Sequence, residues 1–163
     1  MAKAALRSGA GLVTIGCPPA ALQENAARLD AVMLHPIREA ADLAAALEDS
    51  RINAVCLGPG LGVTERTRAM VQTALNSHVP EKARRSVVLD ADALTAFSDD
   101  PGLLFAQLHT NCVLTPHAGE FARLFPDIAQ KLDAPARPRR APEARFCSWG
   151  LTRYFLTKWA WRT

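Results

Sequence analysis

The chain has 163 residues, of which 49% are hydrophobic and 21% charged, and its formal net charge is +3. This composition is typical of a folded domain with a buried core, and it excludes wholesale disorder. No apolar run approaches the roughly 20 residues that a membrane helix needs, and the residues after Met1 do not have the pattern of a secretory leader.

The first third of the chain predicts alternating helices and strands. We expect a helix over residues 2–8, closed by glycines, and a short buried strand over residues 12–15. A second helix is predicted over residues 20–28, where Pro19 precedes the helical segment. A strand over residues 31–34 and an alanine-rich helix over residues 40–48 follow.

The middle of the chain continues this alternation. Strands are predicted over residues 54–57, 87–89 and 112–114, and all three are continuous apolar runs. Thr64 is the expected cap of a helix that runs to about Ser77, and another helix begins at Phe121. Apolar strands separated by helices predict an α/β fold with a mostly parallel sheet covered by helices on both faces.

Three loops that follow predicted strands carry the candidate functional residues, and ligands of open α/β sheets bind at that edge. The first loop is a glycine run that contains Gly58, Gly60 and Gly62. Glycines let the backbone approach a ligand closely, and the helix after them offers its positive end to an anion, so phosphate is the natural ligand. A tight turn that merely needs glycine explains the same residues equally well.

The second loop contains two carboxylates, Asp90 and Asp92. Carboxylates at this position can bind a hydroxyl group or magnesium-bound phosphate, or take part in proton transfer. Asp92 is at least as well explained as the cap of the next helix. Asp90, directly at the strand end, is therefore the better functional candidate.

The third loop runs from Thr115 to Glu120 and contains a single histidine. Pro116 restricts the turn, and Gly119 permits a close approach. His117 can hydrogen-bond a ligand or move a proton, whereas Glu120 is explained by its favourable interaction with a helix N-terminus.

The last 29 residues differ from the rest. Residues 1–134 contain 12 basic and 15 acidic side chains, whereas residues 135–163 contain 7 basic and 1 acidic, all three tryptophans and the only tyrosine. A basic aromatic segment can bind nucleic acid or an anionic membrane. The segment has no regular hydrophobic period, so we expect neither partner and interpret it as a divergent tail.

The four cysteines, Cys17, Cys56, Cys112 and Cys147, lie far apart and lack metal-ligand spacing. We therefore expect no disulfide scaffold and no zinc module, and a reducing cytoplasm is the predicted compartment. No residue is assigned as a metal ligand.

The motifs together resemble the NAD(P)H-hydrate dehydratase family. The resemblance rests on four segments in order: residues 4–14, the glycine run 58–62, the LDADAL segment 89–94 and the TPHAGE segment 115–120. It covers residues 4–125 and implies a three-layer α/β/α ribokinase-like fold. It also implies dehydration of (S)-NADHX or (S)-NADPHX, coupled to hydrolysis of ADP or ATP with Mg²⁺.

The resemblance also suggests roles for individual residues. Ala4, Gly62 and His117 stand where the family contacts the hydrated dinucleotide. Asp90 and Asp92 match a segment of less certain polar role. An NAD(P)H-hydrate epimerase is the implied protein partner, and a homo-oligomer is expected.

The chain departs from the family in two ways. The family continues into a lysine-glycine loop for the adenine nucleotide and a GSGD-type motif with a catalytic aspartate, and neither occurs after Leu132. We therefore assign no catalytic residue. The interpretation is a partial ribokinase-like domain over residues 1–134, truncated at both ends, followed by a tail over residues 135–163 that a shifted reading frame would explain.

Two other functions remain open from the sequence. A ribokinase-like kinase of small molecules, such as vitamin precursors, would share the fold and the phosphate-binding loops. A non-catalytic remnant that binds a dinucleotide is the second alternative, and the absent GSGD-type motif favours it for this chain.

Overall fold

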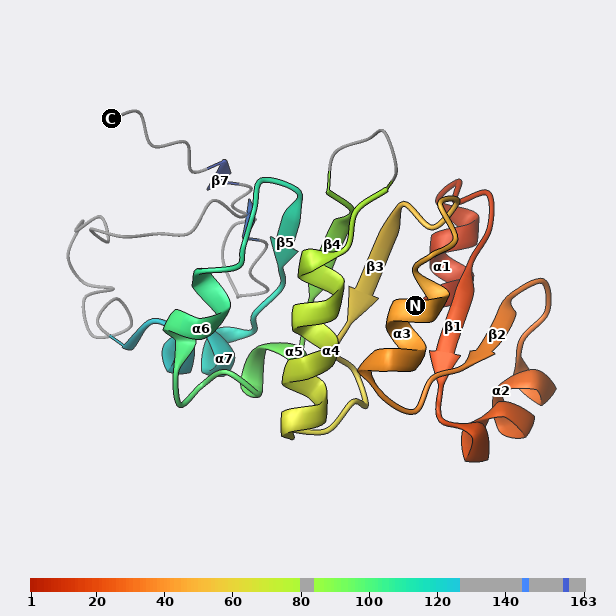
Figure 1. Ribbon diagram of the computed structural model, residues 1–163, viewed down its shortest axis with the longest axis horizontal. Coiled ribbons are helices and arrows are strands. Elements are labelled where there is room, and N and C mark those ends of the chain that lie inside the picture. The colour runs from red at the N-terminus through yellow and green to blue at the C-terminus, as the bar shows by residue number, and fades with distance from the viewer. Residues whose placement is uncertain (80–83, 127–144, 147–156, 159–163) are drawn as a thin grey trace. The chain divides into compact units, whose positions relative to one another are not determined.

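The computed structural model describes residues 1–79, 84–126, 145–146 and 157–158 (Figure 1). The chain divides into two compact units, of which the first is Met1–Glu48 and the second begins at Asp49. In the described part of the chain, none of the helices has the length and apolar character needed to cross a bilayer.

The first unit contains two parallel strands and short helices. Its elements are α1 (Ala2–Arg7), β1 (Thr14–Cys17), the 3-10 turn η1 (Pro19–Ala21), α2 (Leu22–Arg28), β2 (Met33–Pro36) and α3 (Ala40–Ala46). Strand β1 pairs with β2 from Thr14 opposite Met33 to Cys17 opposite Pro36. Both strands begin two residues later than predicted, because the hydrogen-bonded ladder starts at Thr14 and leaves Leu12 66% exposed.

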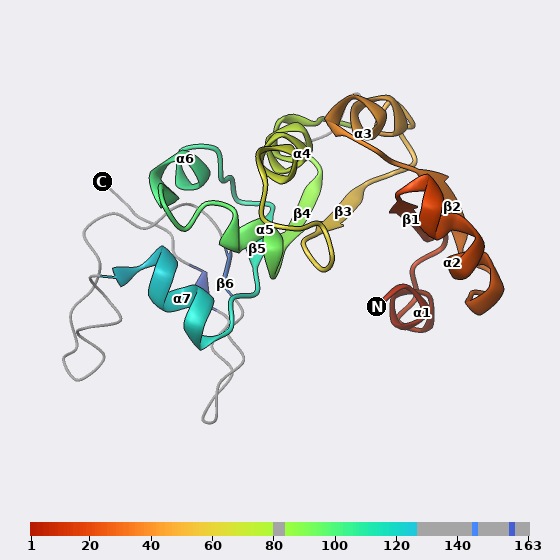
Figure 2. The ribbon, with the colours of Figure 1, turned by 90° about the horizontal axis from the view of Figure 1, so that it is seen from below.

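The second unit contains a five-stranded sheet. Its elements are β3 (Ala54–Leu57), α4 (Glu65–Asn76), β4 (Ser86–Leu89), α5 (Asp92–Thr95), α6 (Pro101–Phe105), β5 (Cys112–Leu114), α7 (Ala118–Leu124), β6 (Arg145–Phe146) and β7 (Thr157–Lys158). The strand order is β3-β4-β5-β6-β7, and only the β6–β7 pair is antiparallel. Helices α4 and α6 lie on one face of this sheet and α7 lies on the other (Figure 2). The predicted α/β architecture with mostly parallel pairing is confirmed, although the described strands form two sheets.

The core of the second unit lies between α4 and the sheet. Helix α4 buries residues at helical spacing, and its Val71 and Leu75 are fully buried together with Val87, Leu89 and Leu114 of the strands. Burying a side chain of this size stabilises a fold by about 1.5–3 kcal/mol. The helix itself begins as predicted, since the Thr64 hydroxyl accepts a hydrogen bond from the Thr67 amide.

The register of β3, β4 and β5 aligns their carboxyl ends. Leu57 lies opposite Leu89, and Leu89 lies opposite Leu114, so β3, β4 and β5 end in one row. The ladder continues one residue further, because the Asp90 amide donates to Leu57 O and the Thr115 amide donates to Leu89 O, each at 3.0 Å. The three loops singled out in the sequence therefore leave the sheet at the same edge.

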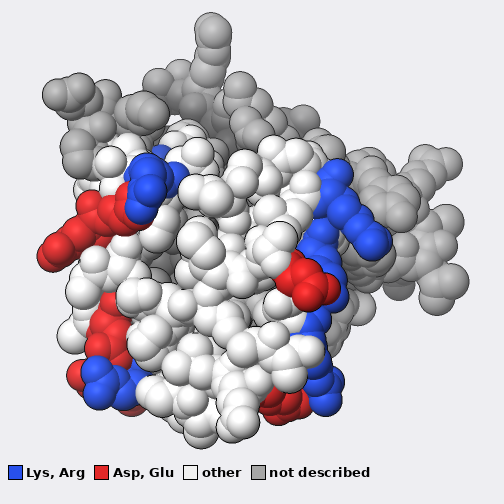
Figure 3. All heavy atoms as spheres, turned by 90° about the vertical axis from the view of Figure 1, so that its right-hand side faces the viewer, with Lys and Arg blue, Asp and Glu red and all other residues white. Residues whose placement is uncertain are grey.

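Charged side chains on the face seen in Figure 3 form separate groups that combine both signs, with uncharged surface between them. Ion pairs in the first unit have this mixed character, as Arg28 lies 3.0 Å from Glu24 and Arg38 lies 3.0 Å from Asp42. Such exposed pairs contribute little to stability.

Most of the predicted tail, residues 135–163, lies outside the described residues. The exceptions are 145–146 and 157–158, which form the two-residue strands β6 and β7. The domain boundary after Ala134 stays a prediction.

Candidate functional site

The glycine run begins with a close backbone contact. Gly58 has φ +145°, and a Cβ there would lie 1.7 Å from the carbonyl oxygen of Asp90. Only glycine fits this position, because any side chain would overlap the backbone of the neighbouring loop. Gly60 and Gly62 also have positive φ, but a Cβ on either would meet open space. The first glycine therefore packs the two loops together, and the other two shape the turn.

The structure ties the glycine run to the aspartate loop through a side chain. The Gly62 amide donates to Asp92 Oδ2 at 2.8 Å. The Gly62 carbonyl accepts a hydrogen bond from the Thr67 hydroxyl at 2.5 Å. Both sides of the Gly62 backbone are thus held, one by α5 and one by α4.

The interpretation of Asp92 as a helix cap is wrong. The N-cap of α5 is Ala91, which has no side-chain cap bond, and Asp92 is the first residue of the helix. Its carboxylate reaches across to the glycine run instead, because the two loops follow neighbouring strands in register. Local sequence patterns could not predict this bond, because its two residues are 30 positions apart in the chain.

The backbone between the two aspartates is strained. Ala91 has φ +46° and ψ −121°, a region that residues with a side chain rarely adopt. Such a conformation costs on the order of 1–3 kcal/mol and persists only where surrounding contacts enforce it. Here it turns the chain sharply after β4, which leaves the half-buried Asp90 at the sheet edge and directs Asp92 toward Gly62.

His117 and Glu120 form the start of α7. His117 is the N-cap, and its Nδ1 accepts from the amides of Gly119 at 3.0 Å and Glu120 at 3.3 Å. In return, the His117 amide donates to Glu120 Oε2 at 2.9 Å, which completes a capping box. Helix α7 therefore begins at Ala118 and not at Phe121, and the first-turn position predicted for Glu120 is confirmed.

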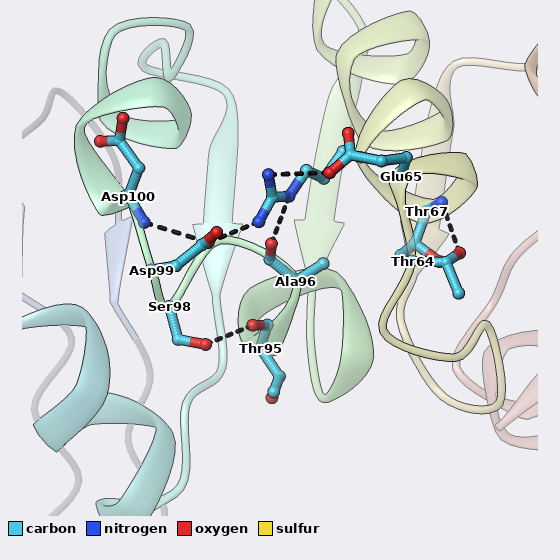
Figure 4. Close-up of polar contacts among 9 residues, drawn as sticks. Thr64, Glu65, Thr67, Thr95, Ala96, Ser98, Asp99 and Asp100 are labelled. Atoms are coloured by element: carbon cyan, nitrogen blue, oxygen red, sulfur yellow. Dashed lines mark hydrogen bonds and ion pairs between the residues drawn. The ribbon is translucent and has the colours of Figure 1, made fainter.

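Arg68, which no sequence pattern indicated, stabilises the same edge of the sheet. Arg68 of α4 donates through Nε to Ala96 O at 2.6 Å, and its two terminal nitrogens lie 3.0 Å from Glu65 and 2.5 Å from Asp99. Figure 4 shows the Glu65, Ala96 and Asp99 acceptors that converge from two segments of the chain. Hydrogen bonding to Arg68 lowers the pKa of Asp99. The guanidinium holds α4 against the end of α5, and only the fold brings these residues together.

The structure thus brings Gly58, Gly60, Gly62, Asp90, Asp92 and His117 to the loops at one edge of one sheet. Ala4 lies on α1 in the first unit, so its place beside these loops stays a prediction. In the described ranges, no group of three or more His, Cys, Asp or Glu side chains is arranged to hold a metal ion. Cys17 and Cys112 are buried free thiols.

Comparison with known proteins identifies the family. The family model described as NAD(P)H-hydrate dehydratase matches residues 1–144. The chain belongs to the NAD(P)H-hydrate dehydratase family. The resemblance predicted from the four segments is therefore confirmed.

Individual relatives agree with this assignment. The bifunctional NAD(P)H-hydrate repair enzyme Nnr of Gloeobacter violaceus is 37% identical over 133 residues, which are 79% of this chain and 25% of that protein. The ATP-dependent (S)-NAD(P)H-hydrate dehydratase of Ixodes scapularis is 34% identical over 142 residues, which are 87% of this chain and 43% of that protein. The chain spans less than half the length of these relatives.

Solved structures support the fold. A ribokinase-like superfamily protein from Enterococcus faecalis matches with a TM-score of 0.69 and 22% identity, over 91% of this chain and 51% of that one. The ADP/ATP-dependent NAD(P)H-hydrate dehydratase from Bacillus subtilis, co-crystallized with ATP/Mg²⁺, matches with a TM-score of 0.53 and 24% identity, over 81% and 44%. The ribokinase-like α/β fold is confirmed.

Proposed function

We propose that this chain supplies the dinucleotide-binding loops of an enzyme that dehydrates (S)-NADHX or (S)-NADPHX to NADH or NADPH, coupled to hydrolysis of ADP or ATP. The observation that carries the proposal is the strand register that ends β3, β4 and β5 in one row. Three loops with glycines, carboxylates and a histidine then share the edge where α/β sheets bind ligands.

Gly62 and His117 are the proposed contacts to the hydrated dinucleotide. Gly60 and Gly62 carry no side chain and face open space where a Cβ would stand, so a ligand can approach their backbone. The His117 side chain is 62% exposed. It follows β5, which is separated from β3 by β4 in the sheet. Ala4 is proposed as a third contact from the first unit.

The family implies Mg²⁺, and this sheet edge offers a carboxylate that can bind the ion. Mg²⁺ is commonly bound by one or two carboxylates together with substrate phosphates. The half-buried Asp90 would hold the ion, since Asp92 already accepts the Gly62 amide. When bound, the ion neutralises negative charge on the phosphates.

The chemistry depends on positioning. Transfer of a phosphoryl group to the hydroxyl of the hydrate makes a good leaving group, and loss of phosphate together with a ring proton restores the nicotinamide. The described residues bind and orient the dinucleotide in this scheme. The catalytic aspartate is assigned to none of them.

A turnover assay tests the proposal. Purified protein is mixed with NADHX, Mg²⁺ and either ADP or ATP, and the absorbance of reduced nicotinamide is followed. We expect turnover for which His117→Ala raises KM for NADHX by about 2- to 10-fold, the loss of one hydrogen bond. His35→Ala, at an exposed histidine without a predicted role, should leave KM unchanged. Absence of turnover with both nucleotides would contradict the enzymatic proposal.

A second candidate function is a dinucleotide-binding remnant without catalysis. The described loops at the shared sheet edge offer binding groups, and none of their residues is assigned a catalytic role, which favours this candidate. It predicts calorimetric binding of NADHX that requires His117, without turnover. The family match favours both candidates over a kinase of vitamin precursors.

The remaining proposals concern the cellular context. Several relatives are named as bifunctional NAD(P)H-hydrate repair enzymes, which supports an NAD(P)H-hydrate epimerase as the functional partner. Free thiols at Cys17 and Cys112 fit a reducing cytoplasm. A homo-oligomer is proposed from the family resemblance, and size-exclusion chromatography with light scattering tests it.

A further inference from the structure

The two ring nitrogens of His117 have different surroundings. Nδ1 accepts hydrogen bonds from two backbone amides, at 3.0 Å from Gly119 and 3.3 Å from Glu120. A nitrogen that accepts hydrogen bonds carries no proton, and a neutral imidazole has one proton to place. The proton of the neutral ring therefore resides on Nε2.

We propose that the α7 cap holds His117 in the Nε2–H tautomer, so that the ring meets its ligand as a hydrogen-bond donor and not as a base. This inference rests on the proposed function, because it names how the histidine of that same site acts. The complementary group on the ligand is an oxygen acceptor, such as a phosphate or carboxamide oxygen of the dinucleotide.

Glu120 is the positioning residue for this ring. Its side chain is 6% exposed, whereas that of His117 is 62% exposed, so a buried carboxylate orients an accessible imidazole. One carboxylate oxygen accepts the His117 amide at 2.9 Å, and the other lies 3.2 Å from Nε2. The carboxylate therefore holds the backbone of His117 and lies beside the single Nε2 proton, so a ligand oxygen must share this acceptor position or replace the carboxylate in it.

Gly119 makes the cap geometry possible. A Cβ at this position would lie 3.0 Å from Cε1 and 3.3 Å from Nδ1 of His117. These distances are tighter than ordinary van der Waals contact, so a side chain would push the ring away from the amides. The sequence predicted that Gly119 permits a close approach, and the group that approaches is the His117 ring.

The tautomer is measured without any substrate. Long-range ¹H–¹⁵N correlation spectra of the labelled protein above pH 8 distinguish Nε2–H from Nδ1–H imidazole, and the His117 signals are those missing from His117→Asn. We expect the Nε2–H tautomer for wild type, a mixture for Glu120→Ala, and rescue by Glu120→Gln, because glutamine also completes a capping box. An Nδ1–H or mixed ring in wild type would overturn the inference.

The donor role is measured with the substrate. Asparagine is among the best N-caps, so His117→Asn keeps the cap of α7 but removes the ring donor, whereas His117→Ala removes both. We expect His117→Asn to unfold at the wild-type urea midpoint, and His117→Ala to unfold earlier. Both variants should raise KM for NADHX by about 2- to 10-fold, the loss of one hydrogen bond.

His35→Asn makes the same replacement at an exposed histidine of β2 and should leave KM unchanged. A wild-type KM in His117→Asn would overturn the donor role, and equal destabilisation by asparagine and alanine would overturn the cap. If wild type itself has no turnover, the proposed function fails, whereas the NMR result still decides the tautomer.

Discussion

The two edges of the β3-β4-β5 sheet differ in the side-chain hydrogen bonds made to the backbone at the ends of the helices. At the carboxyl edge, the acceptors Asp92, Thr64 and His117 bind backbone amides. At the amino edge, the donors Arg85 and Asn111 bind backbone carbonyls. The polarity of the parallel sheet therefore favours acceptors where helices begin and donors where they end, although Thr67 and Arg68 also donate to backbone carbonyls at the carboxyl edge.

The physical reason is the direction of the helices. In a parallel α/β sheet, helices begin at the carboxyl edge, where their first amides lack partners, and end at the amino edge, where their last carbonyls do. Arg85 is only 2% exposed and binds Ile52 O at 2.6 Å, His78 O at 2.9 Å and Asp49 O at 3.3 Å. The amino edge is therefore stabilised by a buried arginine, whereas the exposed His117 ring leaves the carboxyl edge open to a ligand.

The largest expected effect is at Gly58. Gly58→Ala places a methyl group 1.7 Å from the Asp90 carbonyl at φ +145°. The backbone must move, and we expect a loss of more than about 3 kcal/mol in the free energy of unfolding. Urea denaturation measures it. Gly60→Ala is the matched control, since its Cβ meets open space and only the φ of +79° is unfavourable, which costs about 1 kcal/mol.

The second prediction breaks the amino edge alone. Arg85→Met removes the side-chain donor that three part-buried carbonyls share, and we expect a loss of about 1–3 kcal/mol in the free energy of unfolding. Arg85→Lys keeps one charged donor and should lose less. Dinucleotide affinity should not change in either variant, and a weakened affinity would show that the two edges are not separate in function.

The third prediction concerns the carboxyl edge. Asp92→Ala removes the acceptor of the Gly62 amide, so the glycine run loses its attachment to α5. We expect the calorimetric Kd for NADHX to rise by about 3- to 10-fold, the equivalent of one hydrogen bond. Asp92→Asn retains an acceptor oxygen and should be less affected. An unchanged Kd in Asp92→Ala would remove Gly62 from the proposed site.

The smallest effect is a pH dependence of the amino edge. Burial, followed by the charge of Arg84, lowers the pKa of His109 from its ordinary value of 6.5. Below pH 6.5 the unfolded chain therefore binds more protons than the folded chain at this residue, and stability is lost as the pH falls through that range. His109→Gln should flatten this part of the urea-midpoint profile between pH 5 and 7.5. An identical slope in both proteins would contradict the assignment.

Local patterns predicted the strands and their order well in the second unit. Residues 54–57 and 112–114 form strands with the predicted bounds, and Thr64 caps α4 as expected. These segments combine an apolar run with a clear boundary, namely a glycine, a capping threonine or a proline turn. The same reasoning misplaced the first-unit strands by two residues, because apolar Leu12 lies outside the β1–β2 ladder.

Composition and motif order by themselves determined the α/β class, the family and the loops that carry the candidate residues. Only the tertiary structure decided what those residues do to one another: that Asp92 binds Gly62, that Gly58 packs on Asp90, and that His117 caps α7. Residue types and spacing record what a segment can form by itself. A bond across 30 residues depends on strand register, which is settled only when the whole sheet assembles.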